Sequence, residues 1–257
     1  MKIVTLVENT VCREDLRAEH GLSLYIETGD YKILLDMGQS DAFSENAKRL
    51  GVDLSRVDFA VLSHGHYDHG GGLMTFLQIN SHAPVYVHKA AFGEYYNGTE
   101  KYIGLPKHLK DHPRVILCDG SQELASGITL TDCAEENWAF SSWGLCRKDD
   151  DVFSPDDFVH EHYLLIREGE KRVVLSGCSH RGIENIAAHF RADALIGGFH
   201  LNKQTEEAAL DRIAQNLLSY GTTYYTGHCT GNTQFAQLSK TMSHRLQSIS
   251  TGTVLIL

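Results

Sequence analysis

The segment HGHYDH at residues 64–69 places three histidines and one aspartate within six residues, one residue after the apolar run 59–62. The run predicts a buried strand, and the glycines at 65 and 70–72 predict a tight loop that leads into a helix. Imidazole nitrogens and carboxylate oxygens are donors that suit zinc, manganese or iron. The spacing lets His64 and His66 reach one ion and lets Asp68 and His69 turn toward a second. The segment therefore predicts a cradle for two metal ions at a strand end.

Other histidine-bearing loops also lie at the ends of predicted strands. Cys178 and His180, His200 and His228 follow the apolar runs 171–175, 194–196 and 222–225, and His160 and His162 precede the hairpin partner of the first run. Loops at one edge of an open α/β sheet are free to converge on a ligand. We therefore expect these side chains to gather at the rim that carries residues 64–69.

The composition is that of an ordinary globular protein, with 42% apolar and 22% charged residues among 257. The formal net charge is -10, and no lysine and arginine cluster offsets it, so nucleic acids and anionic membranes are disfavoured as partners. No stretch has the roughly 18 apolar residues of a membrane span. Residues 1–8 resemble a strand more than a signal peptide, and the six cysteines form no CxxC pair. These features predict a cytoplasmic protein with reduced thiols.

Apolar periodicity and turn residues predict the order of the elements. A hairpin covers 22–35, a helix covers 41–50, and a second hairpin covers 163–175. After it, predicted helices at 183–190, 206–218 and 233–242 alternate with strands at 194–196, 222–225 and 254–256. The segment 94–113 lacks periodicity and is predicted to be an inserted loop or a loose helix. We expect one domain over 1–257, with two sheets packed face to face and helices outside.

The segment 64–69 matches the HxHxDH signature of the metallo-β-lactamase superfamily, and the resemblance covers nearly the whole chain. It implies an α/β four-layer αβ/βα sandwich with a dinuclear metal site at the sheet edge. Further segments resemble one subfamily, whose members are labelled dihydropterin ribofuranosylaminobenzene 5′-phosphate synthases. These segments are Glu19–Ser23, Leu35–Ser40, Ser63–Leu73, Gly177–Ile183, Gly197–Leu201 and Thr226–Gly231.

The resemblance also implies a set of metal ligands. His64 and His66 would hold the first ion, and Asp68, His69 and His228 would hold the second. For the third ligand of the first ion His180 is favoured, with His160, His162 and, less well, Glu161 as alternatives. Cys178 stands where relatives place a bridging aspartate, and it is either a thiolate ligand or an ordinary buried thiol.

The expected activity is that of a metal-dependent hydrolase with two divalent ions, zinc being favoured over manganese or iron. Such ions lower the pKa of a bound water and stabilise the developing anion in the hydrolysis of an ester or phosphoester. Asp68 can hold or deprotonate the nucleophile, and His200 either protonates the leaving group or orients a ligand. Asp36 is expected to orient either a ligating histidine or the loop after its strand, without touching metal. The substrate is expected to be a small, phosphorylated, pterin-like molecule, with Arg181 and Lys203 as candidate cations.

Three other functions are consistent with the same resemblance. An RNA-processing nuclease is disfavoured by the acidic charge and by the lack of a basic arm. A diiron redox protein is disfavoured because such relatives carry glutamate at the position of His66 and append a flavin domain. A non-catalytic ligand-binding module need not keep its metal ligands, whereas this sequence keeps nearly all of them.

Overall fold

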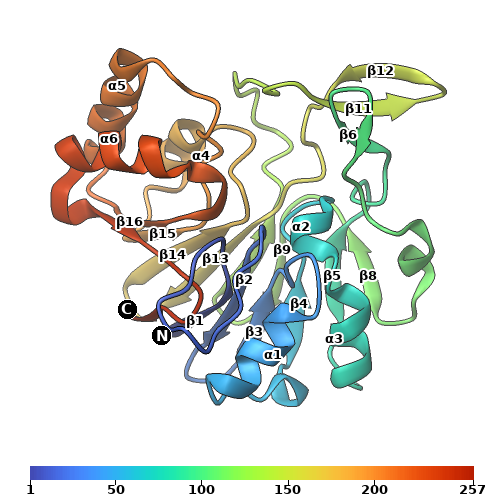
Figure 1. Ribbon diagram of the computed structural model, residues 1–257. Helices are drawn as coiled ribbons and strands as arrows, with labels where there is room; N and C mark the ends of the chain where they lie inside the picture. The colour runs from blue at the N-terminus through green and yellow to red at the C-terminus, as the bar shows by residue number, and fades with distance from the viewer. The chain divides into compact units, whose positions relative to one another are not determined.

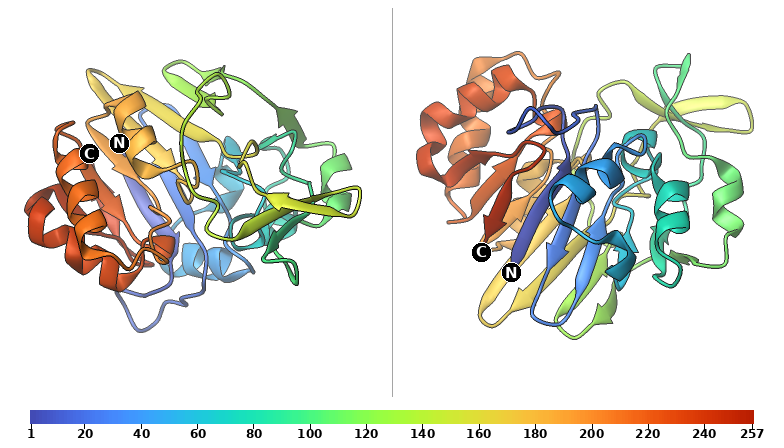
Figure 2. Two further views of the ribbon diagram at one scale, coloured as in Figure 1. Left: turned by 90° about the horizontal axis from the view of Figure 1, so that it is seen from above. Right: turned by 60° about the horizontal axis from the view of Figure 1, so that its bottom comes forward.

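The structure has two compact parts, and the strands of each part determine where its polar loops lie. The computed structural model describes residues 1–257, which divide into two compact units. Unit 1 comprises Met1–Asp119, Gly144–His162 and Ser250–Leu257, and unit 2 comprises Gly120–Trp143 and Tyr163–Ile249. Figures 1 and 2 show the two ends of the chain close together in unit 1, where the Met1 ammonium donates to Leu257 O at 3.2 Å.

Unit 1 is built on a seven-stranded sheet with the order β18-β1-β2-β3-β4-β5-β8. The first four strands of that order pair antiparallel, and β3, β4, β5 and β8 run parallel. Loops that follow these parallel strands therefore emerge at one edge. In chain order the strands are β1 (Lys2–Val7), β2 (Ser23–Glu27), β3 (Lys32–Leu35), β4 (Phe59–Val61), β5 (Val85–His88), β8 (Val115–Cys118) and β18 (Val254–Ile256).

The helices of unit 1 cover one face of this sheet and share a core with it. Phe43 of α1 and Phe76 of α3 are fully buried among strand residues such as Leu34 and Val85. Burying aromatic and aliphatic side chains between a helix and a sheet is the main source of stability in such a layer. The helical segments are α1 (Ala42–Arg49), η1 (Leu54–Arg56), α2 (Tyr67–Gly70), α3 (Leu73–Ile79) and η2 (Lys107–Asp111).

A second, four-stranded sheet in unit 1 was not predicted. Its order is β12-β11-β6-β7, with β6 (Tyr95–Asn97), β7 (Lys101–Tyr102), β11 (Leu145–Asp149) and β12 (Val152–Pro155). The prediction of a loop or loose helix over 94–113 is therefore wrong for 95–102, because these residues form a hairpin that pairs with residues 145–147. Because this sheet depends on pairing between distant segments, the segment 95–102 shows no local hydrophobic periodicity.

Unit 2 also has a seven-stranded sheet, with the order β17-β16-β15-β14-β13-β10-β9. The strands from β14 to β17 pair parallel, and those from β9 to β14 pair antiparallel. In chain order the strands are β9 (Gln122–Ala125), β10 (Ile128–Thr131), β13 (Tyr163–Glu168), β14 (Lys171–Ser176), β15 (Ala194–Ile196), β16 (Thr223–Thr226) and β17 (Leu246–Ser248).

Three helices of unit 2 share a core with its sheet. Ile186, Leu217 and Leu238 come from the three helices and pack with Leu195 and Tyr224 of the strands. The helical segments are α4 (Ile183–Phe190), α5 (Glu207–Leu218), η3 (His228–Thr230), α6 (Asn232–Met242) and η4 (Ser243–Arg245). None of the helices has the length and hydropathy that crossing a membrane requires. The mixed α/β class is confirmed, and the single-domain assignment stays a prediction.

Candidate metal centre

The loop after β4 brings its histidines together as the sequence predicted. His64 and His69 are fully buried, and His66 and Asp68 are 3% and 8% exposed. The ring centroid of His64 lies 4.5 Å from that of His66 and 4.1 Å from that of His69. Three imidazoles and a carboxylate thus share one buried place at the parallel-strand edge of the unit 1 sheet.

Asp36, the residue after β3, positions this cluster through hydrogen bonds. Its Oδ1 accepts the backbone N–H of Ser63 at 2.7 Å, and its Oδ2 lies 2.7 Å from both Ser63 Oγ and His69 Nδ1. Ser63 Oγ in turn lies 2.8 Å from His64 Nδ1. The expectation that Asp36 orients a histidine of the cluster agrees with these contacts.

These contacts set the tautomers of two histidines. A carboxylate only accepts hydrogen bonds, so His69 Nδ1 carries the proton in its contact with Asp36. Ser63 Oγ donates to Asp36 and therefore accepts from His64 Nδ1–H. In both rings Nε2 is left with the lone pair, which is the form in which an imidazole ligates a metal ion.

His160 and Asp156 form a second buried pair beside the cluster. His160 Nδ1 accepts the backbone N–H of Gly65 at 2.9 Å, and His160 Nε2 lies 3.2 Å from Asp156 Oδ2. The same carboxylate oxygen lies 3.9 Å from His66 Nε2. Both ring nitrogens of His160 are thus in use within unit 1, which favours a positioning role for His160 over a ligand role. His162 is also buried, with its ring 4.9 Å from that of His88.

Two residues near the cluster were not predicted to take part in a site. Asp156 is 2% exposed, and its pKa is lowered because hydrogen bonds and charges from His160 and His66 outweigh its burial, which alone would raise it. His20 precedes β2, which runs antiparallel to β3, so it reaches the same edge and places Nε2 3.3 Å from Asp68 Oδ2. Only the strand order connects His20 to this edge, because it lies far from 64–69 in the sequence.

Burial keeps His64 and His66 neutral. Burial is the main cause that lowers the pKa of His66 to about 4, with the charge of His160 acting in the same direction. Burial, and then the charges of His69 and His66, hold the pKa of His64 well below its usual value. Neutral imidazoles bind a divalent ion without first losing a proton. The donors of unit 1 therefore fit a divalent metal.

The metal-free protein should lose stability as the pH falls from about 6.5 to about 4. The unfolded chain binds a proton on His66 near the ordinary pKa of about 6.5, whereas the folded chain binds it only near about 4. The difference costs roughly 3 kcal/mol of unfolding free energy at the acid end of this range. Urea unfolding of chelator-treated protein at a series of pH values measures it. His66→Gln should flatten the pH dependence of the unfolding free energy, whereas His82→Gln, at an exposed position, should not. If neither variant changed this pH dependence, the assignment of the effect to His66 would be wrong.

The predicted residues of unit 2 lie after its parallel strands. Cys178 and His180 follow β14, His200 follows β15, and His228 follows β16. Cys178, His180 and His228 are 3%, 3% and 6% exposed. The three loops therefore meet at one edge of the unit 2 sheet, as the sequence predicted for strand-end loops.

Cys178, His200 and Cys229 approach one another closely at this edge. Their Sγ and ring nitrogen atoms lie within 4.8 Å of one another, and the backbone N–H of His200 donates to Cys229 Sγ at 3.3 Å. Gly198 permits this approach, because a Cβ there would overlap Cys229 Sγ. His200 has a positive φ of 49°, which is strained for a side-chain-bearing residue and is typical of functional loops. Cys178 therefore lies in a group of sulfur and nitrogen atoms that could hold a metal ion.

The two candidate cations for phosphate recognition are engaged elsewhere. Arg181 donates to the carbonyl oxygens of Asp132 at 2.5 Å and Glu136 at 3.0 Å. Lys203 Nζ donates to Trp143 O at 2.5 Å. Both side chains hold the segment 132–143 in place, so neither expectation of a phosphate contact gains support.

Comparison with known proteins agrees with the resemblance. The profile of the family described as "Metallo-beta-lactamase superfamily" matches residues 16–228. A Methanocaldococcus jannaschii protein named 7,8-dihydropterin-6-methyl-4-(beta-D-ribofuranosyl)-aminobenzene-5'-phosphate synthase is 30% identical, over 90% of this chain and 88% of its own. A protein of the same organism described as uncharacterized is 29% identical, over 93% and 94% of the two chains.

A solved structure extends the likeness to three dimensions. It is described as a metal-dependent hydrolase of the beta-lactamase superfamily, and it superposes with a TM-score of 0.87 at 28% sequence identity. The superposition covers 100% of this chain and 99% of the other. The expected fold class is therefore confirmed.

Proposed function

Because the chain belongs to the metallo-β-lactamase superfamily, we propose that it is a metal-dependent hydrolase that cleaves an ester or phosphoester bond. The observation that carries the proposal is the buried group of neutral imidazoles, with Asp68 beside them and Asp36 setting two tautomers. Holding uncharged imidazoles away from water in fixed tautomers destabilises a protein unless they bind something. A divalent cation is the ligand that these donors suit.

The proposed ligands are those that the family resemblance implies. Five of them are His64, His66, Asp68, His69 and His228. To these we add His180, the favoured third ligand of the first ion, and Cys178, which stands where relatives place an aspartate. Two ions are proposed, with zinc favoured because imidazole and thiolate donors suit it. When bound, such ions lower the pKa of water and stabilise negative charge that develops on the substrate.

The protein's own residues supply positioning and proton transfer. We propose that Asp68 orients or deprotonates the attacking water, since its carboxylate lies 3.7 Å from His69 Nε2 and 3.3 Å from His20 Nε2. We propose that His200 protonates the leaving oxygen, because its two ring nitrogens are shielded from solvent and have no hydrogen-bond partner in the protein. Asp36 acts only through Ser63 and His69.

The proposed substrate is a small, phosphorylated, pterin-like molecule. The name of the 30% identical relative supports this class. A nucleic acid substrate is disfavoured by the net charge of -10. A cytoplasmic location is proposed because none of the six cysteines forms a disulfide.

Metal analysis on protein purified without chelators or an affinity metal tests the proposal. Wild type should carry about two equivalents of divalent metal and hydrolyse bis-p-nitrophenyl phosphate. Asp68→Ala should lose metal and turnover together, and Cys178→Ala should lose metal only if the thiol ligates. Asp53→Ala, at an exposed position, controls for the loss of a carboxylate. Substoichiometric metal that reconstitution does not restore, without turnover, would refute the hydrolase.

A further inference from the structure

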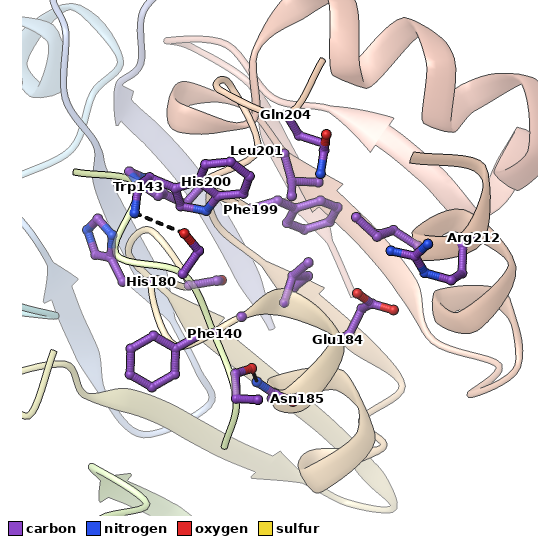
Figure 3. Close-up of a pocket in the computed structure, with 16 residues that line it drawn as sticks. Phe140, Trp143, His180, Glu184, Asn185, Phe199, His200, Leu201, Gln204 and Arg212 are labelled. Atoms are coloured by element: carbon purple, nitrogen blue, oxygen red, sulfur yellow. Dashed lines mark hydrogen bonds between the residues drawn. The ribbon is translucent and has the colours of Figure 1, made fainter. Parts of the chain in front are cut away.

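Unit 2 contains a pocket of about 200 Å³ beside the two histidines of its edge. The segment 139–143, the first turn of α4, the residues 199–204 and one face of α5 surround it (Figure 3). His180 and His200 lie on one side of the view, and Glu184 and Arg212 lie on the other. Phe199 and Leu201 lie between the two sides. The pocket therefore extends from the proposed proton donor to a charged far end.

Two imidazoles form one end of the pocket. The ring centroids of His180 and His200 are 4.2 Å apart. Both ring nitrogens of His200 are buried without a hydrogen-bond partner in the protein. A ligand in the pocket would contact the ring of His200, and a rotation of that ring would let one of the unpaired nitrogens bond to the ligand, which is favourable in a shielded place.

The walls of the pocket are fixed in advance of binding. Trp143 N–H donates to Ser141 Oγ at 3.2 Å, and Lys203 holds Trp143 O at 2.5 Å. Asn185 Nδ2 donates to Ala139 O at 2.9 Å, which ties the segment 139–143 to α4. Because these contacts already order the segment, a ligand would not bear the cost of ordering it.

The far end of the pocket carries one cation without a partner. The side chain of Arg212 makes no hydrogen bond and no ion pair in the protein, in contrast to those of Arg181 and Lys203, which both donate to backbone carbonyl oxygens. Glu184 also lines the pocket, and its Oε1 accepts a hydrogen bond from Asn216 Nδ2 at 2.7 Å. Arg212 is therefore the guanidinium in this pocket that can take an external anion.

We propose that this pocket binds the non-reacting part of the substrate, a ring that carries an anionic group, with Arg212 contacting that group. The inference rests on the proposed hydrolase function and adds to it a substrate class and a specificity-determining residue. The apolar side chains Phe199, Leu201 and Trp143 suit a flat ring. The anionic group is a phosphate or a carboxylate, since a guanidinium pairs with either through two hydrogen bonds. The carboxylate of Glu184 limits the negative charge that a ligand can carry at the far end of the pocket.

Binding of two matched compounds tests the inference. Phenylphosphonate and 4-carboxyphenylphosphonate share the ring and the phosphonate and differ only in the carboxylate. Calorimetric titration of the metal-loaded protein should show that wild type binds the carboxylate compound about tenfold more tightly. Arg212→Gln should abolish this preference and leave the affinity for phenylphosphonate in place. Glu184→Gln should strengthen the preference, because it removes a negative charge near the carboxylate.

Arg167→Gln, an equal change of charge at an exposed position of β13, controls for the net charge and should keep the preference. The inference would be overturned if wild type bound the two compounds with equal affinity. It would also be overturned if Arg212→Gln weakened the binding of both compounds by the same factor. If metal content and turnover of bis-p-nitrophenyl phosphate are normal in such a protein, the hydrolase proposal stands and only the pocket assignment fails. If metal and turnover are absent from wild type, the hydrolase proposal fails on its own measurement, and the same titration of the metal-free protein decides whether Arg212 gives a preference for the carboxylate compound.

Discussion

Asp36→Asn should give a folded protein that binds its metal ions about 10 to 100 times more weakly than wild type. The introduced asparagine would keep the bond from Ser63 N–H to its oxygen, but its amide would donate where the carboxylate now accepts. His69 Nδ1 would then become the acceptor, and its proton would move to Nε2. Through Ser63 Oγ the same reversal would reach His64. One substitution would thus place protons on two proposed ligand atoms.

Asparagine suits this test better than alanine does. Asp36 has a positive φ of 58°, which asparagine tolerates well and alanine does not. Nitrogen-15 spectra of the imidazoles report the tautomers directly, and competition with a chromogenic chelator reports the metal affinity. Asp41→Asn, whose side chain is 56% exposed, is the matched control and should bind metal like wild type. If the spectra and the affinity of Asp36→Asn matched those of wild type, Asp36 would have no positioning role.

Gly65→Ala should destabilise the protein by about 3 kcal/mol or more, because the new methyl group has no space. An added Cβ would lie 2.9 Å from Ala91 Cα and would overlap Ala91 O, and both of these atoms belong to the backbone and cannot rotate away. Displacing Gly65 would also strain its bond to His160 Nδ1. Urea unfolding measures the loss, which should appear in the metal-free protein too.

Gly29→Ala is the control for this substitution. A Cβ at Gly29 would meet no atom within 4 Å, so its effect should stay within about 0.5 kcal/mol of wild type. Equal stabilities of the two variants would show that the loop 64–69 does not lie against Ala91. A loss of metal binding in Gly65→Ala without a loss of stability would assign the effect to the site alone.

Loop 64–69 could be predicted because its information is local. The apolar run 59–62 is followed by Ser63 and then by His64, and the neighbouring glycines mark the turn. The same local signal, a strand followed by a polar loop, correctly placed Cys178 and His180 after β14 and His228 after β16. Asp36 was predictable for the same reason, as the first residue after β3.

What the sequence did not show depends on contacts between distant segments. His20 reaches Asp68 only because β2 runs antiparallel to β3, and Asp156 reaches His160 and His66 from a segment without periodicity. The hairpin of β6 and β7 went unpredicted because its partner strand lies some way along the chain. Arg212 lies on an exposed position of the amphipathic helix α5, where sequence alone predicts only solvation.

The strand β18 affects when during synthesis the sheet of unit 1 can be completed. Residues 254–256 pair with residues 2–4 of β1, so the edge of the unit 1 sheet joins the last strand to the first. Closing so long a loop carries a high entropic cost, and contacts of this kind tend to form late in folding. On the ribosome, the histidines of 64–69 are therefore made long before the sheet beneath them is complete. We therefore expect the proposed metal site to be completed only after β18 has been made and has paired with β1.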